Sequence, residues 1–511
     1  MRKINEYDII SPTMKGFTKG DNMTRRAGVL CPLFSVPGNQ GIGDLGEKTN
    51  RMIDAIADAG YKIWQILPLQ FSGQSHSPYQ TYSSFAGDPI YINIDRLSEM
   101  GLLNISSITN CNKFKDYVDY DTVRAFKEPY LKKAFRAFKK QFEIFQTEYE
   151  EFCKEAFWLD DWATYQVFKN LHDQLPWNEW EEEYRDYPLY QELELDEFEE
   201  ELFYHKFLQF IFYSQLDDIR IYAHSRGLEI MGDVPFYVDL DSADVWSSRD
   251  DFLLDEKGEP KFVAGCPPDY FSETGQRWGM PIYDFTHQKL NDYCFWSKRM
   301  AWMSRCFDIV RIDHFRAFDT YWKIPSECPT AIDGEWIEGP SHELIRTILE
   351  TSPKIQLVAE DLGMIRPEVL DLEADFDIPG MDVLLFRLES KLLKKPTKKE
   401  VVVYTGTHDN MTANQMYYTV TSNQRISLRR FFKKQGYEER NFHDMLCHYA
   451  LDTLADTVIL PIWDICGYKE EARINFPGTV SEKNWTWKLK DFKIFPDELK
   501  KTSAWIKEAK R

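Results

Sequence analysis

The chain has 511 residues, of which 43% are hydrophobic, so it can bury a large core. Its formal net charge of −21 argues against nucleic acid or an anionic membrane as a partner, because both select for basic surfaces. The aromatic content of 15% suits stacking on sugar rings, although most aromatic side chains simply fill a core.

Residues 1–26 are polar, and we expect them to form an N-terminal arm. They contain no apolar signal core, and no stretch of the chain approaches the length that spans a membrane. The nine cysteines are scattered without a CxxC pair, which is typical of reduced thiols. We therefore expect a cytoplasmic protein.

Eight apolar runs, most of them separated by segments able to hold a helix, are expected to form parallel strands. The runs are Gly28–Phe34, Lys62–Leu69, Leu228–Val234, Asp308–Asp313, Gln356–Glu360, Asp382–Arg387, Val401–Gly406 and Thr457–Ile462. This alternation predicts a (β/α)8 TIM barrel over residues 27–490, followed by a C-terminal helix or tail over 491–511.

About 160 residues separate the second run from the third, far more than one crossover needs. Their acidic, aromatic and helix-favouring sequence predicts a large helical insertion between strands 2 and 3, over about 96–225. The charged stretch Glu179–Glu201 is interpreted as a solvated helix face.

Gly41–Gly46 match the GxGxxG spacing of a dinucleotide-binding loop. Such a loop joins a strand tightly to a helix, and an acidic residue ends the next strand. Here the turn Pro37–Gln40 intervenes, and the next run ends at Leu69 without an acid. A glycine-lined active-site loop is therefore preferred to a nucleotide site.

The histidines and cysteines show neither an HExxH motif nor paired CxxC spacing, so no metal site is expected. The GxSxG elbow of serine hydrolases and the P-loop are also absent from the sequence. Acid–base and carboxylate chemistry is left as the main candidate.

Three acidic residues, Asp313, Glu360 and Asp409, stand at or just beyond the ends of apolar runs. The C-terminal ends of barrel strands meet at one mouth, where catalytic groups converge. Glycosidic-bond chemistry needs one carboxylate as nucleophile and another as proton donor. Separate salt bridges are the structural alternative, but three acids at successive strand ends favour a shared site.

Arg311 and Asp313 face the same way on a strand, so Arg311 can hydrogen-bond Asp313 and hold it ionised. Glu360 must instead keep a proton, which requires a drier setting. Asp361 points to the opposite side, where a packing role is expected.

Residues 265–280 are rich in turn formers and aromatics, and we expect them to form a lid loop. Tyr270, Phe271 and Trp278 would be available there to stack on sugar. An ordinary packed loop is the alternative.

Three segments, Val310–Arg316, Ala359–Gly363 and Thr405–Asn410, resemble the 4-α-glucanotransferases, also called amylomaltases or disproportionating enzymes, of the α-amylase superfamily. The resemblance runs from Gly28 to about Lys488. It includes Gly41–Gly46, Ser77–Tyr79, Met231–Pro235, Pro267–Gly279, Ala472–Thr479 and Asn484–Trp485.

The resemblance implies that Asp313 is the nucleophile, Glu360 the general acid/base and Asp409 the residue that stabilises the transition state. The sugar-binding residues that it implies are Tyr79, Arg311, His314, His408, Asp233, Ser77 and Asn475. It implies no organic cofactor and no catalytic metal. The expected reaction transfers a segment of an α-1,4-glucan to the 4-hydroxyl of glucose or a maltodextrin, with maltodextrins, starch or glycogen fragments as donors.

Two alternatives share these residues: an α-amylase-like glycoside hydrolase and a catalytically silent glucan-binding protein. The chain departs from the family pattern at Ala317, Met280 and Met411, and its stretch 386–400 is short and basic. These departures leave the catalytic groups intact and bear on the acceptor site and on the preferred chain length. The sequence leaves the oligomeric state open.

Overall fold

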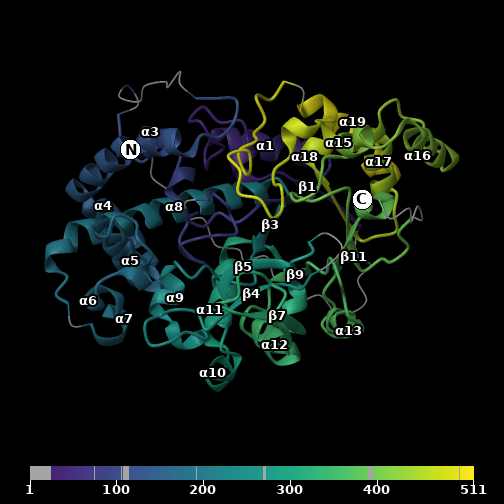
Figure 1. Cartoon of the computed structure of the whole chain (residues 1–511). Coiled ribbons are helices and arrows are strands. Elements are labelled where there is room, and N and C mark those ends of the chain that lie inside the picture. Colours follow the sequence, from purple (N-terminus) through teal and green to yellow (C-terminus); the bar gives the residue numbers. More distant parts are fainter. Residues whose placement is uncertain are drawn as a thin grey trace.

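The computed structural model describes residues 25–73, 75–104, 106, 114–191, 193–268, 272–389, 395–493 and 495–511. Apart from its last two residues, the predicted N-terminal arm lies outside them. One eight-stranded parallel sheet forms the centre of the molecule (Figure 1). Its strands are β1 (Arg26–Leu30), β2 (Ile63–Gln65), β3 (Glu229–Val234), β6 (Ile309–Ile312), β9 (Gln356–Ala359), β10 (Gly380–Val383), β11 (Val401–Tyr404) and β12 (Thr457–Pro461).

The sheet runs in the order β10-β11-β12-β1-β2-β3-β6-β9. Its two end strands are joined by the N–H of Ala359, which donates to the carbonyl of Pro379 at 2.9 Å. Beside this bond the Asp361 carboxylate accepts the N–H of Met381 at 2.6 Å. Gly380 is required at this seam, because a Cβ there would collide with the Asp361 carboxylate. The predicted (β/α)8 barrel is confirmed, and Asp361 has the packing role expected of it.

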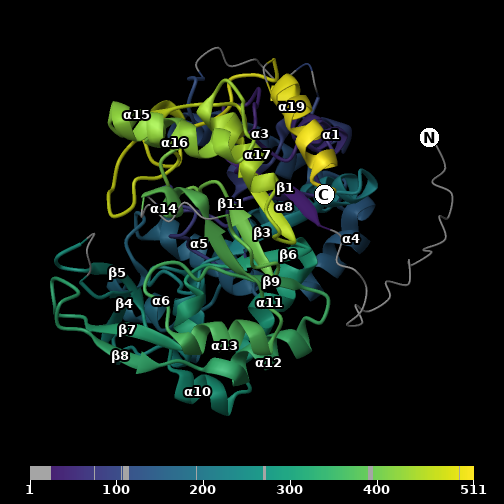
Figure 2. The ribbon, with the colours of Figure 1, turned by 90° about the vertical axis from the view of Figure 1, so that its right-hand side faces the viewer.

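Helices surround the sheet, some against it and others, such as α10 and α16, farther out (Figures 1 and 2). They include α1 (Glu47–Asp58), α10 (Phe285–Leu290), α11 (Cys294–Cys306), α12 (Ser341–Thr351), α13 (Pro367–Asp375), α15 (Ala413–Thr419), α16 (Ser422–Lys434), α17 (Phe442–Leu451), α18 (Ile462–Ile465) and α19 (Phe495–Glu508). In α1 the buried side chains Met52, Ile53 and Ile56 recur at helical spacing, so one apolar stripe is buried, and the helix contacts α8 (Glu199–Ser225) and α19. No helix in the described ranges is long and apolar enough to cross a membrane.

The expected insertion between strands 2 and 3 is helical, and its helices α4 to α7 lie together at one side of the barrel (Figure 1). It consists of α2 (Ile94–Glu99), α3 (Tyr120–Lys140), α4 (Phe142–Glu155), α5 (Leu159–Leu171), α6 (Glu182–Arg185), α7 (Tyr187–Tyr190) and α8 (Glu199–Ser225). Phe138 of α3 packs on Phe203 and Phe207 of α8, which ties the insertion together by aromatic contacts. Three glutamates begin α8, where the helix dipole favours negative charge.

A second sheet of four antiparallel strands lies beside the barrel, with the order β5-β4-β7-β8 (Figure 2). Its strands are β4 (Phe262–Cys266), β5 (Gln276–Pro281), β7 (Thr320–Pro325) and β8 (Glu335–Glu338). Residues 265–280, expected to form a loop, therefore begin in β4 and end in β5. The ends of the predicted loop are strands because of a tertiary contact, since β4 pairs with β7 as well as with β5. Tyr270 and Phe271, expected to stack on sugar, lie outside the described residues.

The predicted strand Asp382–Arg387 is wrong in its second half. Pairing with β11 ends at Val383, and the chain turns directly into α14 (Leu384–Glu389). Leu384 and Leu385 are buried, so an apolar run that looked like one strand serves a strand and a helix in succession. The short helix α9 (Ala243–Ser247) lies in the loop that follows β3.

Candidate active site

The carboxylates of the site come from neighbouring strands of the barrel. Asp313 directly follows β6, and its N–H donates to the carbonyl of Val234 at 2.9 Å. Glu360 directly follows β9, and its N–H donates to the carbonyl of Ile312 at 3.0 Å. Parallel pairing of β3, β6 and β9 thus brings the ends of these strands to one mouth of the barrel.

The surroundings of Glu360 favour the protonated form of its side chain. Its Oε2 accepts a hydrogen bond from the backbone N–H of His314 at 2.8 Å. Burial, together with the negative charge of Asp313, raises the pKa of Glu360 to about 8. The side chain is therefore mostly protonated at neutral pH and can act as a proton donor.

Arg311 links Asp313 to a second acid, Asp233 of β3. The Arg311 side chain is buried, and its Nη1 donates to both carboxylate oxygens of Asp233 at 2.8 and 2.7 Å. Its Nη2 donates to Oδ1 of Asp313 at 2.8 Å. One guanidinium fork thereby fixes two carboxylates, while the Asp313 side chain stays 33% exposed. The contact predicted from the two-residue spacing is confirmed.

Tyr79 enters the same network from the loop after β2. Its hydroxyl donates to Oδ2 of Asp233 at 2.9 Å, and its ring stacks on that of His408 with centroids 5.1 Å apart. Ser77 supports this loop, since its hydroxyl accepts the N–H of Tyr79 at 3.3 Å. The Tyr79 ring is thereby set at a fixed angle beside the carboxylates.

Asp409 is held from the loop after β11. Its Oδ1 accepts a hydrogen bond from Nδ2 of Asn475 at 2.7 Å, and His408 Nε2 lies 3.4 Å from Oδ2. The backbone N–H of Asn475 also donates to the carbonyl of His408 at 3.2 Å. Asp409 remains 45% exposed, so one side of its carboxylate faces open space.

His314 connects the carboxylates to the hairpin of β4 and β5. Its backbone has a φ of +54°, and its ring meets that of Trp278 edge-on with centroids 4.9 Å apart. Burial lowers the pKa of His314 to about 4, so the imidazole is neutral at pH 7. Its Nε2 and the hydroxyl of Tyr237 are buried and have no hydrogen-bond partner among the described residues.

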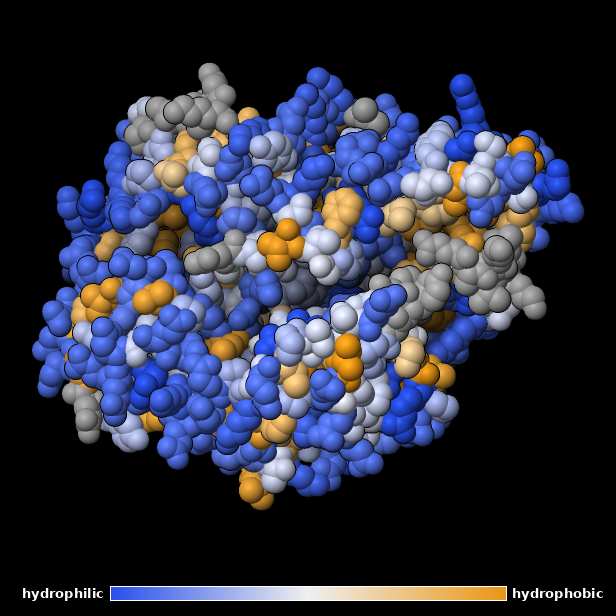
Figure 3. Space-filling model, viewed as in Figure 1, coloured by the Kyte–Doolittle hydropathy of each residue, from blue (hydrophilic) through white to orange (hydrophobic). Residues whose placement is uncertain are grey.

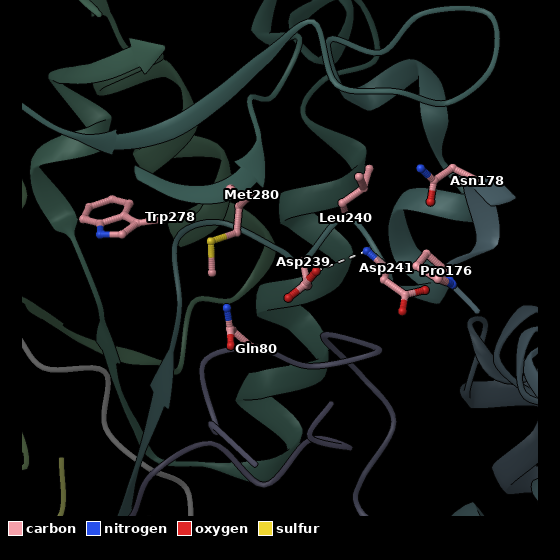
Figure 4. A pocket seen from close by; sticks show the side chains of 9 residues that line it. Gln80, Pro176, Asn178, Asp239, Leu240, Asp241, Trp278 and Met280 are labelled. Carbon is pink, nitrogen blue, oxygen red and sulfur yellow. Dashed lines mark hydrogen bonds between the residues drawn. The ribbon is translucent and has the colours of Figure 1, made fainter. Parts of the chain in front are cut away.

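A cavity of about 310 Å³ opens beside Trp278 (Figure 4). Trp278 and Met280 of β5 lie at one end of it, and Asn178 and Pro176 of the helical insertion lie at the other. Between them, the backbone N–H of Asp241 donates to Oδ1 of Asp239 at 3.2 Å. Figure 3 shows a mostly hydrophilic face of the molecule that is hollowed across its middle.

The structure brings most of the sequence-predicted residues into one network of contacts. Its members are Asp313, Glu360, Asp409, Tyr79, Arg311, His314, His408, Asp233, Asn475 and Trp278. Ser77 is one step removed, because it contacts the backbone of Tyr79. No group of three or more His, Cys, Asp or Glu side chains in the described part of the chain is arranged to hold a metal ion.

Two aromatic residues of the site were missed as site residues by sequence reasoning. Trp485 packs against both Tyr79 and His408, with ring centroids 5.7 and 5.8 Å away. Its place in the Asn484–Trp485 part of the closing motif was the signal that could have found it. The ring centroid of Tyr237 lies 6.2 Å from those of Trp278 and His314, and no motif three residues after β3 marked it as a site residue.

Comparison with known proteins agrees with this site. Residues 31–494 match the family model of the 4-alpha-glucanotransferases, glycoside hydrolase family 77. A 4-alpha-glucanotransferase of Thermus thermophilus is 38% identical over 96% of this chain and 99% of its own length, and one of Synechocystis is 38% identical over 93% and 95%. The structure of an amylomaltase from Streptococcus agalactiae in complex with acarbose superposes with a TM-score of 0.89, at 30% identity over 95% of this chain and 99% of that one. The chain therefore belongs to the 4-alpha-glucanotransferases of glycoside hydrolase family 77.

Proposed function

We propose that the chain performs its 4-α-glucanotransferase reaction by a retaining double displacement at Asp313 and Glu360. Asp313 attacks the anomeric carbon of a glucose unit within an α-1,4-glucan. The bond from that carbon to the glycosidic oxygen breaks, and Glu360 gives its proton to this oxygen. The observation that supports these roles is the pairing of an arginine-held Asp313 with a Glu360 whose pKa is raised to about 8.

The second displacement regenerates both carboxyl groups. The 4-hydroxyl of an acceptor attacks the same carbon, the bond to Asp313 breaks, and Glu360, now ionised, takes the hydroxyl proton. The acceptor is glucose or a maltodextrin, and the donors are maltodextrins or fragments of starch or glycogen. A cytoplasmic location remains a prediction that suits these substrates.

The third acid, Asp409, is assigned to the positive charge that develops on the sugar ring. Its Oδ1 accepts from Asn475 and its Oδ2 lies 3.4 Å from His408 Nε2, while the 45% exposure of the side chain leaves it open to the hydroxyls of the reacting unit. A carboxylate held in this way stabilises the transition state without having to reorganise. Tyr79 forms a platform for that unit, and Asp233 acts through Arg311 and Tyr79.

The acceptor is assigned to the side of Trp278. The Trp278 ring packs edge-on against His314, which follows the nucleophile, and the 310 Å³ cavity leads onward from the Trp278 ring. Transfer exceeds hydrolysis only where water is kept out, and we assign this role to the hairpin of β4 and β5, to which Trp278 belongs.

The test is to incubate the purified protein with maltotriose alone and to resolve the products over time. A ladder of longer maltodextrins with released glucose, and little gain in reducing ends, is expected. Glucose and maltose with rising reducing ends would assign the chain to the hydrolases, and no change would assign it to the silent glucan-binding proteins. The Asp313→Asn variant should lose turnover while keeping its circular dichroism spectrum.

A further inference from the structure

The segment after β2 that carries Tyr79, here called the Tyr79 loop (residues 69–73 and 75–88), folds back on itself in two arms. The N–H of Phe71 donates to the carbonyl of Ala86 at 2.9 Å, and the N–H of Gly73 donates to that of Gln80 at 3.0 Å. Tyr79 and Gln80 follow one another in this loop, and Gln80 lines the 310 Å³ cavity (Figure 4). The position of the loop therefore decides where two side chains of the site lie.

Asp88 joins the two arms at the base of the loop. Its carboxylate is buried, and Oδ1 accepts the backbone N–H of Ile90 at 3.0 Å. Oδ2 accepts the hydroxyl of Ser72 at 3.3 Å, and Ser72 forms an antiparallel bridge with Thr81 of the other arm. A buried carboxylate is costly unless it is paired with a cation, and the cation comes from another part of the chain.

Arg124 of α3, in the helical insertion, supplies the positive charge. Its Nη1 donates to Oδ1 of Asp88 at 2.8 Å, and its Nη2 donates to Oδ2 at 2.7 Å. The guanidinium carbon also lies 4.8 Å from the centroid of the Phe71 ring. Arg124 thus contacts one arm through Asp88 and the other through Phe71. The paired hydrogen bonds require the planar fork of an arginine.

The helical insertion contacts the Tyr79 loop at two further points. The ring of Tyr120, the first residue of α3, is stacked on that of His76 with centroids 4.4 Å apart, and its hydroxyl donates to the carbonyl of Trp485 at 2.8 Å. Gln209 of α8 accepts the N–H of Gly87 at 2.8 Å and donates to the carbonyl of the same residue at 2.9 Å. The loop is therefore held by two helices of the insertion.

We propose that the helical insertion positions the sugar platform, with Arg124 acting through Asp88 and the Tyr79 loop to set the angle of the Tyr79 ring. The hydrogen bonds of Arg124 within the described residues go to Asp88 alone, so Arg124 is a positioning residue. A displaced platform misaligns the reacting unit with the nucleophile, which lowers kcat more than it raises KM. The proposal rests on the role of Tyr79 in the proposed function.

A double-mutant cycle tests whether Arg124 acts through Tyr79. Arg124→Lys keeps the charge but not the fork, so kcat for maltotriose disproportionation should fall by about three- to tenfold. In the Tyr79→Ala background the same change should lower kcat by less than about twofold, because the ring that it displaces is gone. Arg96→Lys, the matched change in α2, where Arg96 pairs with Asp218, should leave kcat unchanged in both backgrounds. Circular dichroism verifies the folding of each protein.

The outcomes separate this proposal from the proposed function. An Arg124→Lys enzyme with the original kcat, beside an impaired Tyr79→Ala enzyme, would overturn the positioning role and leave the platform in place. Equal losses in the two backgrounds would also overturn it, because Arg124 would then support the fold in general. A fully active Tyr79→Ala enzyme would overturn both the platform and its positioning.

A second variant covers the case in which Arg124→Lys does not fold. Asp88→Asn keeps one oxygen for Arg124 and for the N–H of Ile90, but it cannot accept from the second nitrogen of the fork. It should show the same fall in kcat and the same dependence on the Tyr79 ring. The same results that would overturn the role of Arg124 apply to this variant.

Discussion

Arg311 and Asp313, two residues apart at the end of β6, are joined by a hydrogen-bonded ion pair of 2.8 Å. The same guanidinium binds both oxygens of Asp233, so its two terminal nitrogens are divided between the two acids. A guanidinium provides this planar geometry, and a lysine ammonium does not. The position of the nucleophile therefore depends on the shape of the Arg311 side chain as well as on its charge.

The first prediction concerns this shape. Arg311→Lys keeps the positive charge but cannot hold both carboxylates, so kcat for maltotriose disproportionation should fall by about 10²-fold. Arg305→Lys, a change of the same kind in a peripheral ion pair with Asp217, should have no effect. Product chromatography measures both, and circular dichroism verifies folding. An Arg311→Lys enzyme with more than half of the original kcat would contradict the role assigned to the fork.

The second prediction concerns the proton of Glu360. Because its pKa is raised to about 8, the free enzyme holds the protonated donor below that pH and loses it above. The logarithm of kcat/KM for maltotriose should therefore decline as the pH rises through about 8, with a slope approaching −1. An alkaline limit near the usual glutamate pKa would show that another group donates the proton. The Glu360→Gln variant should show no such decline with pH, and its kcat/KM should be lower by about 10²–10⁴-fold.

Tyr79 makes two separable contacts. Tyr79→Phe removes the hydrogen bond to Asp233 but keeps the stacked ring on His408, so kcat/KM should fall by about three- to tenfold. Tyr79→Ala removes the ring as well and should cost clearly more. Equal losses in the two variants would mean that the platform contributes nothing beyond the hydroxyl.

Met280 gives a prediction about the acceptor. It lines the cavity beside Trp278 with an apolar thioether, and it is one of the positions at which the chain departs from the family pattern. Met280→Asn would supply amide donors and acceptors, and KM for glucose as acceptor should fall by about two- to tenfold at fixed donor concentration. Leu290→Asn, an exposed substitution outside the cavity, is the control. An unchanged acceptor KM would remove Met280 from the acceptor path.

The last prediction concerns stability at the barrel seam. Glu373 of α13 is buried, and burial, with the charge of Asp361, raises its pKa to about 8. The folded protein then holds a proton that the unfolded chain releases near pH 4.5, so stability is full below that pH and is lost as the pH rises toward 8.

Glu373→Gln should remove the loss of stability that the ionisation of Glu373 causes as the pH rises. Between pH 5 and 8 the free energy of unfolding of the variant should decline by about 1–2 kcal/mol less than that of the original protein, measured by urea denaturation. Glu368→Gln is an exposed change on the same helix, and the free energy of unfolding of this variant should decline with pH in parallel with that of the original protein. Parallel curves for all three proteins would mean that Glu373 titrates normally.

Much of the active site follows from local sequence. Apolar runs with acids at their ends locate Asp313, Glu360 and Asp409, because a buried parallel strand places an ionisable group only where it emerges. The period of two along a strand also places Arg311 on the same side as Asp313 and Asp361 on the other side from Glu360. These relations need only a strand, and any fold with that strand preserves them.

Contacts between distant segments were decided by the tertiary structure. Asp233 meets Arg311 and Tyr79 from 78 and 154 residues away, and Asn475 meets Asp409 from 66 residues away. The raised pKa of Glu360 likewise requires both burial and the charge of Asp313 on a neighbouring strand. The hairpin of β4 and β5 could not be predicted from local sequence either, because β4 pairs with β7, nearly 60 residues later.

The sequence by itself determined which residues emerge at strand ends, since pleating is local. Barrel closure and loop packing determined which of those residues meet, since the register between strands depends on the whole chain.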